Sequence, residues 1–474
     1  MGKIQIIRHI NTIYAIILFF LGIFFGKIRS ELFDGADRLY EMIAFKINYF
    51  GHFRFSTNLN GILPWIISHF TDSPNLILYS FILNYSLTPF LFLLLFRHYF
   101  KDEYLVTFFL LGLTMFYTIL FFHPNHDVLF GYYYTILLYG FLRNRSSHEK
   151  LYLFKVFIIC ILYAFTHQSQ FPSTILLIFY LKYFQKKDLP LFKIITLLLS
   201  AFIIKLLFFT NGYEMGIYSE IFEFKDRLLY VLKSPLIITF LKSFITTNIM
   251  VSFVFFVTAY VLIKNKNNSL LFFIIIHVFF TLGFIAFFFP NYPYVFATEG
   301  YLKGATLILS IVFIDLIVFN PKFILFHNNI ICLSITYAGT IVVIWLNGIN
   351  YSMYYDNIKY ISQKLKCNTV YYNINAQNLE QYFILHRESA LINLTENNKC
   401  YYFQYVNDTF QITNQVVRRD ISNDKLCFGK ERVIEIPSKD IKALLDNQYS
   451  LIFNLTDLKS REMYQNSINQ SIYK

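Results

Sequence analysis

Four charged residues in the first long polar stretch of the chain recur at the spacing of one helix face. They are Asp34, Asp37, Arg38 and Glu41, at positions i, i+3, i+4 and i+7. At about 100° per residue, residues spaced in this way lie on one side of a helix. The carboxylates of Asp34, Asp37 and Glu41 suit a general base, or ligands for a divalent metal ion that neutralises a phosphate leaving group. The same pattern is typical of the solvated face of a surface helix, and the spacing leaves both interpretations open.

The element that must position these charges is a helix predicted over residues 31–50. Apolar residues recur on its opposite side at three- and four-residue steps, and they are Leu32, Ala36, Leu39, Ile43, Ile47 and Phe50. Two opposed stripes of this kind are typical of a helix that lies in the membrane interface. We therefore expect the apolar stripe to face lipid and the charged stripe to face water.

A second group of candidate ligands is found in a short loop between two apolar runs. It consists of His123, His126 and Asp127. Imidazole and carboxylate groups suit several divalent metal ions, so one interpretation is a metal site. The other is that these residues cap the ends of two membrane helices. A divalent metal ion is the one cofactor that the sequence suggests.

Three further candidates for substrate binding, His167, Gln168 and Lys205, lie near the ends of apolar runs. His167 is followed by Gln168, whose amide suits sugar hydroxyls, although histidines at this depth are also common as hydrogen-bonded interface residues. Lys205 is placed so that its ammonium group can snorkel to phosphate head groups. That phosphate belongs either to bulk lipid or to a specific lipid ligand.

The composition indicates a membrane protein with many spans. Of the 474 residues, 56% are hydrophobic and only 15% are charged, with 57 Phe and 37 Tyr, which is too apolar for an ordinary soluble protein. The formal net charge is +12, but the basic residues sit mainly in short loops and form no basic face with exposed aromatics. We therefore expect no nucleic-acid partner.

Apolar runs predict an all-α polytopic membrane domain over residues 1–345 with about eleven transmembrane helices. The runs lie near 13–25, 76–96, 104–122, 128–142, 151–165, 171–181, 194–209, 245–263, 270–289, 306–319 and 330–345. Lys and Arg residues recur in alternate loops, in phase with Lys3 and Arg8. By the positive-inside rule these loops and the N-terminus are cytoplasmic.

With an odd number of spans, the polar tail over residues 346–474 is extracytoplasmic. Its strand-like runs, among them 369–374, 390–394 and 400–406, alternate with helix-like ones, so we expect a small α/β domain. Cys367, Cys400 and Cys427 lie in this tail, and the sequence does not choose among their three possible pairings.

This layout resembles the GT-C superfamily of polytopic membrane glycosyltransferases. The likeness covers the architecture of the whole chain, and in motif it covers the passage Ser30–Glu41 in the first extracytoplasmic loop. Superfamily members place a catalytic Asp or Glu early in this loop, typically in an adjacent acidic pair. The chain has two acids three residues apart instead, so either Asp34 or Asp37 matches the family's base.

The resemblance implies transfer of a sugar from a polyprenyl-phosphate-linked donor to a glycan or other hydroxyl acceptor. The base deprotonates the acceptor hydroxyl as it attacks the anomeric carbon, and the lipid phosphate leaves. Negative charge that develops on this phosphate needs a fixed cation nearby, for which the candidates are Arg38, Lys205 and Lys303. Glu41 is a further candidate for substrate binding, and membrane lipid is an expected partner.

Two other classes of function share this layout. A polysaccharide polymerase or ligase usually relies on arginines in a large outer loop, and Arg227 is the only arginine between Thr210 and Phe244. A transporter or an assembly protein for surface glycans needs no carboxylate stripe. A transporter also needs polar residues through the middle of the membrane, where His277 is one of few.

Overall fold

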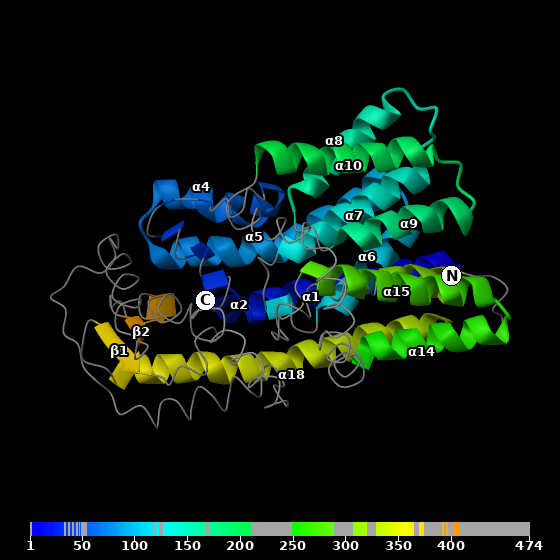
Figure 1. The fold of residues 1–474 in the computed structure, drawn as a ribbon. Helices are drawn as coiled ribbons and strands as arrows, with labels where there is room; N and C mark the ends of the chain where they lie inside the picture. Colours follow the sequence, from blue (N-terminus) through cyan, green and yellow to red (C-terminus); the bar gives the residue numbers. More distant parts are fainter. Residues whose placement is uncertain are drawn as a thin grey trace, which may run out of the picture.

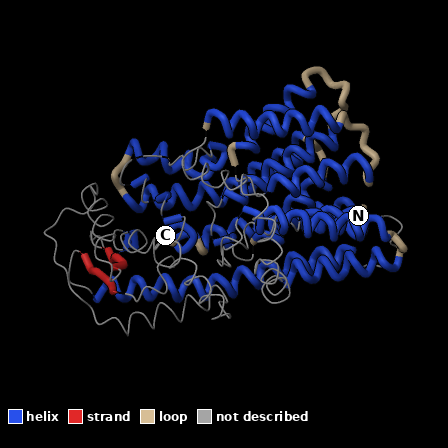
Figure 2. Tube along the Cα trace, in the orientation of Figure 1, coloured by secondary structure: helices blue, strands red, loops and turns tan. Residues whose placement is uncertain are grey.

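The computed structural model describes most of the first 364 residues and a few short pieces of the tail. The described residues are 2–32, 35–36, 38–39, 42–43, 46, 48, 55–117, 120–122, 127–166, 170–209, 249–288, 307–319, 329–364, 369–373, 391–392, 395–396 and 402–406. This part of the chain is mostly helical, and its helices pack side by side along one common direction (Figures 1 and 2).

The elements follow the apolar runs of the sequence. The α-helices are α1 (Lys3–Phe24), α2 (Gly26–Glu31), α4 (Ile62–Phe70), α5 (Pro74–Leu94), α6 (Glu103–Phe116), α7 (Asp127–Asn144), α8 (Tyr152–Ala164), α9 (Phe171–Tyr183), α10 (Leu191–Phe208), α14 (Ile249–Lys264), α15 (Asn268–Phe288), α17 (Leu307–Phe313) and α18 (Asn329–Lys364). Short 3₁₀ turns are η2 (Phe55–Gly61) and η4 (Leu120–Phe122), and π-helical turns are η3 (Leu95–Tyr99) and η8 (Ile314–Val318).

Four of these segments are long and apolar enough to cross a membrane. They are Lys3–Phe24, Pro74–Tyr99, Leu191–Phe208 and Ile330–Met353. Each of the eleven apolar runs contains a helix, but the others are shorter or less apolar in their described parts. The described part of the chain is therefore helical and contains four candidate membrane spans, and eleven crossings remain a prediction.

The two π-helical turns each hold a charged side chain against a neighbouring element. In η3, Arg97 pairs with Glu103 at 3.1 Å. In η8, Asp315 accepts hydrogen bonds from Tyr180 at 2.5 Å and from Gln185 at 2.7 Å. Charged groups among apolar helices are tolerated when they are paired in this way.

Helix α18 runs along the lower side of the bundle in Figure 1 and packs against α1 and α14. The rings of Tyr14 and Tyr337 stack with centroids 3.9 Å apart, and Phe24 stacks on Trp345. The helix continues without a break to Lys364, past residue 345, where the sequence places the end of the membrane domain. Its last turns therefore project beyond the apolar run.

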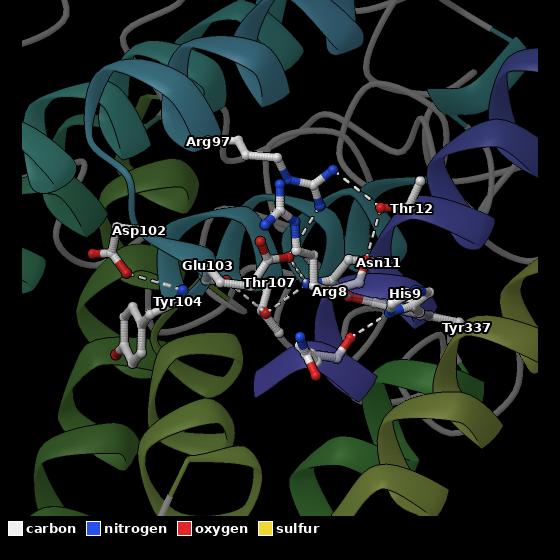
Figure 3. A network of polar contacts seen from close by, with 11 residues as sticks. Arg8, His9, Asn11, Thr12, Arg97, Asp102, Glu103, Tyr104, Thr107 and Tyr337 are labelled. Atoms are coloured by element: carbon white, nitrogen blue, oxygen red, sulfur yellow. Dashed lines mark hydrogen bonds and ion pairs between the residues drawn. The ribbon is translucent and has the colours of Figure 1, made fainter. Parts of the chain in front are cut away.

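A buried polar network fixes α1 against α6 and α18 near the N-terminal end of the bundle (Figure 3). Asn11 is fully buried and donates to Glu103 at 2.8 Å and to Thr107 at 2.9 Å. Its amide oxygen accepts from the Tyr337 hydroxyl at 3.0 Å. One asparagine thus joins three helices.

We expect Asn11→Ala to lower the melting temperature of the purified protein by several degrees. The substitution leaves the buried Tyr337 hydroxyl without its acceptor, which costs about 1–3 kcal/mol. The exposed Asn265 provides the matched control, Asn265→Ala. Equal melting temperatures for the two variants would show that the network does not stabilise the bundle.

Two short strands are described in the tail. β1 (Thr369–Asn373) pairs in parallel with β2 (Tyr402–Val406), with Thr369 opposite Tyr402. They coincide with two of the predicted strands, and the complete α/β domain remains a prediction. Residues 391–392 are helical, so the strand predicted over 390–394 is wrong at this point. Thr395 donates to the carbonyl of Leu391 at 2.9 Å, the four-residue spacing of a helix.

Candidate functional site: a buried charge cluster at the end of the first helix

The chain does not continue as one helix from residue 31 to residue 50. Helix α2 ends at Glu31, because Leu32 is extended with φ −118° and ψ 150°. Beyond this bend, residues 35–36, 38–39 and 42–43 are again helical. The predicted helix therefore begins later than the sequence suggests, and Glu31 belongs to the element before it.

The apolar stripe of this loop packs against protein. Ala36, Leu39 and Ile43 are buried in one apolar cluster with residues of α5 and with Leu391. The prediction that this stripe faces lipid is wrong for these residues. The periodicity shows that the stripe needs an apolar surface to pack against. It does not show whether that surface is lipid or, as here, the apolar face of α5.

Arg38 is also buried, whereas the sequence predicts a water-facing side chain. Its exposed fraction is 8%, and its guanidinium donates to Asn58 at 3.4 Å and to Thr57 at 3.3 Å. Both partners belong to η2, so Arg38 joins the first loop to the turn before α4. Asp34, Asp37 and Glu41, the acids of the same stripe, lie outside the described residues.

A cluster of polar side chains surrounds the carboxyl group of Glu31. Glu31 is fully buried, and its two oxygens accept from different parts of the chain. Oε2 accepts from the Tyr355 hydroxyl at 2.7 Å, and Oε1 accepts from the Thr395 hydroxyl at 2.5 Å. The end of α2, the end of α18 and a piece of the tail therefore meet at one carboxyl group.

A second carboxyl group, that of Glu396, completes the cluster. Lys27 and Lys359 pair with its two oxygens, at 2.5 Å and 2.6 Å. The Tyr355 hydroxyl lies 3.4 Å from Glu396, so it contacts both carboxyl groups. We call this set the Glu31 cluster, and its members are Lys27, Glu31, Tyr355, Lys359, Thr395 and Glu396.

The two carboxyl groups of the cluster have very different acidities. Burial raises the pKa of Glu31 to about 7, against the hydrogen bonds from Thr395 and Tyr355, which favour ionisation. Burial also acts to raise the pKa of Glu396, but the ammonium groups of Lys27 and Lys359 outweigh it and lower this pKa to about 2. Near neutral pH, Glu396 is ionised and Glu31 exchanges a proton with its surroundings.

Most other site residues predicted from the sequence fall outside the described part of the chain. His123, His126, His167, Gln168 and Lys303 belong to this group. Helix α7 begins at Asp127, whose side chain is not described. Within the described ranges no group of three or more His, Cys, Asp or Glu could hold a metal ion, so the predicted metal site remains a prediction about the remaining residues.

Lys205 lies in the last turn of α10 and has an exposed fraction of only 1%. Because the side chain is buried, its ammonium group does not snorkel to bulk lipid, which is one of the two interpretations that the sequence leaves open. The other interpretation, a specific lipid phosphate, remains a prediction. An apolar run shows how deep a residue sits, but it does not show whether the side chain faces lipid or the interior of a bundle.

Sequence reasoning missed most of the Glu31 cluster. In the sequence, Glu31 is only the first residue of the helix predicted over residues 31–50, and the sequence predicts no role for it. Tyr355 and Lys359 are four residues apart on the continuation of α18, and this spacing was the available signal. Thr395 and Glu396 are more than 360 residues from the residues they contact in α2, and no local pattern reveals that contact.

No protein-family model, curated protein or solved structure matches the chain.

Proposed function

We propose that the chain is a multi-pass membrane glycosyltransferase. It moves a sugar from a polyprenyl-phosphate-linked donor to a glycan or other hydroxyl acceptor. In this proposal the bundle crosses the membrane about eleven times, the N-terminus is cytoplasmic, and the tail forms an α/β domain on the extracytoplasmic face. The reaction takes place at the end of the bundle that carries the Glu31 cluster.

The observation that supports this proposal is the Glu31 cluster, in which Glu31 accepts hydrogen bonds from α18 and from the tail at the point where the first loop begins. Burial raises the pKa of Glu31 to about 7, whereas Lys27 and Lys359 lower the pKa of Glu396 to about 2. Neighbouring acids with such different acidities are common at functional sites. This pair lies where the first loop begins, immediately before the acids that the sequence singles out.

In the proposed reaction, one of the first-loop aspartates is the base. Asp34 and Asp37 follow Glu31 by three and six residues. As the acceptor oxygen attacks the anomeric carbon, its proton passes to this carboxylate. The bond between the anomeric carbon and the phosphate oxygen breaks, and its electron pair leaves with the lipid phosphate.

Glu31 acts as a positioning residue in this scheme. Its carboxyl group is fully buried beneath Thr395 and therefore does not touch the sugar. Its hydrogen bonds fix the start of the loop against α18 and the tail, and Arg38 fixes the other side through Thr57 and Asn58. The two anchors enclose the stretch that contains Asp34 and Asp37.

The proposal is tested by sugar transfer from a panel of donors. Membranes that contain the native chain are incubated with radiolabelled polyprenyl-phosphate sugars, and matched membranes without the chain serve as the control. We expect transfer from at least one lipid-linked donor and none from the corresponding nucleotide sugar. Absence of transfer from every donor, with the protein well folded, would favour a transporter or assembly role.

A further inference from the structure

Arg29, in α2, lies at one end of a cavity that α1, α5 and α6 enclose. The other walls are mainly apolar and include Ala15, Leu18 and Leu93. Phe19, Pro89 and Phe90 are half-buried and form the side of the cavity nearest the surface of the bundle. The lining of this small cavity therefore combines one cationic side chain with mainly apolar walls.

The guanidinium of Arg29 is buried, and no counter-ion is found for it within the described ranges of the chain. Its exposed fraction is 3%. Nε donates to the carbonyl of Phe121 at 2.7 Å, and the group lies over the rings of Phe121 and Tyr85 at 4.3 Å and 5.2 Å. No carboxylate among the described residues pairs with it. A buried cation of this kind is costly unless an anion accompanies it.

A second polar group points to the same place. The Ser86 hydroxyl is buried, with an exposed fraction of 4%, and has no hydrogen-bond partner. A methyl group added at Gly22 would lie 2.7 Å from Nη1 of Arg29 and 2.8 Å from Oγ of Ser86. The guanidinium and the hydroxyl therefore both approach Gly22 closely, and any side chain at this position would collide with them.

We propose that this cavity binds the phosphate group of a lipid. Arg29 and Ser86 donate to the phosphate oxygens, and the hydrocarbon chain lies along the apolar walls between α1 and α5. A volume of about 20 Å³ holds one or two water molecules, so a phosphate enters only when Phe19 and Phe90 turn outward. The identification of this lipid as the sugar donor rests on the proposed function, whereas binding of a lipid phosphate does not.

The test is a binding measurement on the purified full-length chain in detergent. Native mass spectrometry counts the bound molecules after addition of a polyprenyl phosphate, phosphatidic acid or the uncharged polyprenol. Inorganic phosphate is tested as a competitor. The test variants are Gly22→Ala, whose added methyl group would collide with both polar groups, and Ser86→Ala, which removes the hydroxyl.

Two substitutions of the same kind serve as controls. Gly283→Ala adds a methyl group that meets no atom within 4 Å. Ser80→Ala removes a hydroxyl of α5 that donates to the Ile77 carbonyl. We expect Gly22→Ala and Ser86→Ala each to weaken binding of the phosphate lipid about tenfold or more, because a hydrogen bond to a charged group is lost. The control variants should bind as the native chain does.

The outcomes distinguish a polyprenyl phosphate from a membrane phospholipid as the lipid that supplies the phosphate. Preference for the polyprenyl phosphate supports the donor as occupant, and equal binding of phosphatidic acid supports a site for membrane phospholipid. Binding of polyprenol at the same level, complete displacement by inorganic phosphate, or insensitivity to both test variants overturns the proposal. The assay needs no acceptor, so failure of sugar transfer with intact binding would refute only the glycosyltransferase function.

Discussion

Replacing Asp34 and Asp37 together by asparagine is expected to abolish most sugar transfer. Loss of a general base typically lowers a rate by about 10²–10⁴-fold. Asparagine has nearly the same shape as aspartate but does not accept the proton of the acceptor hydroxyl. The double variant is therefore expected to reach the membrane at native levels and to show this loss in the transfer assay with the best donor of the panel.

The matched control for this experiment is Asp72→Asn, Asp188→Asn. The side chains of these two residues are 90% and 87% exposed, so their neutralisation should leave transfer within a factor of about two of the native rate, as is usual for surface positions. Full activity in the Asp34→Asn, Asp37→Asn variant would remove the first loop from the chemistry.

Glu31→Gln is expected to make thermal stability less dependent on pH. The pKa of Glu31 is raised by burial from its ordinary value of 4.5 to about 7. A carboxyl group with a raised pKa stabilises the folded state most at low pH, and this contribution falls as the pH rises from 4.5 to 7. At 1.36 kcal/mol per pKa unit, the loss is on the order of 3 kcal/mol.

Glutamine has the shape of the protonated acid and does not ionise, so the variant should melt several degrees higher than the native chain at pH 8. Near pH 5, the two proteins should be similar. The measurement is a melting curve in detergent at intervals from pH 5 to pH 8. Glu149→Gln is the control, because Glu149 is a partly exposed acid paired with Lys155. Parallel curves for the native chain and Glu31→Gln would contradict the assignment of this pKa to a buried, functional carboxyl group.

The positions of the helices were accessible from the sequence because long apolar runs leave little choice of structure. The sequence was less informative about which face of each helix packs against protein and which face is turned to lipid. Leu39 and Lys205 belong to patterns that suit either lipid or protein as a neighbour, and both are buried in the protein. Hydropathy measures the preference of a side chain for an apolar surrounding and does not identify that surrounding.

The partners of charged residues at the ends of apolar runs were also not predictable from the sequence. Lys27 and Arg29 follow the first apolar run, where basic residues normally mark topology. In the structure Lys27 pairs with Glu396 in the tail, and Arg29 is buried beside Ser86 and Phe121. The contacts that join α2 to the tail connect residues that are far apart in the sequence. A short window of neighbouring residues therefore does not predict them.

In the function that we propose, the end of the bundle at the Glu31 cluster holds the transferred sugar. The most direct test is photo-crosslinking with a polyprenyl-phosphate sugar that carries a diazirine on the sugar ring, followed by identification of the labelled peptides. The account predicts labels within residues 27–41 and near Tyr355 at the end of α18. Labels confined to the opposite end of α1, around Arg97 and Glu103, would contradict it.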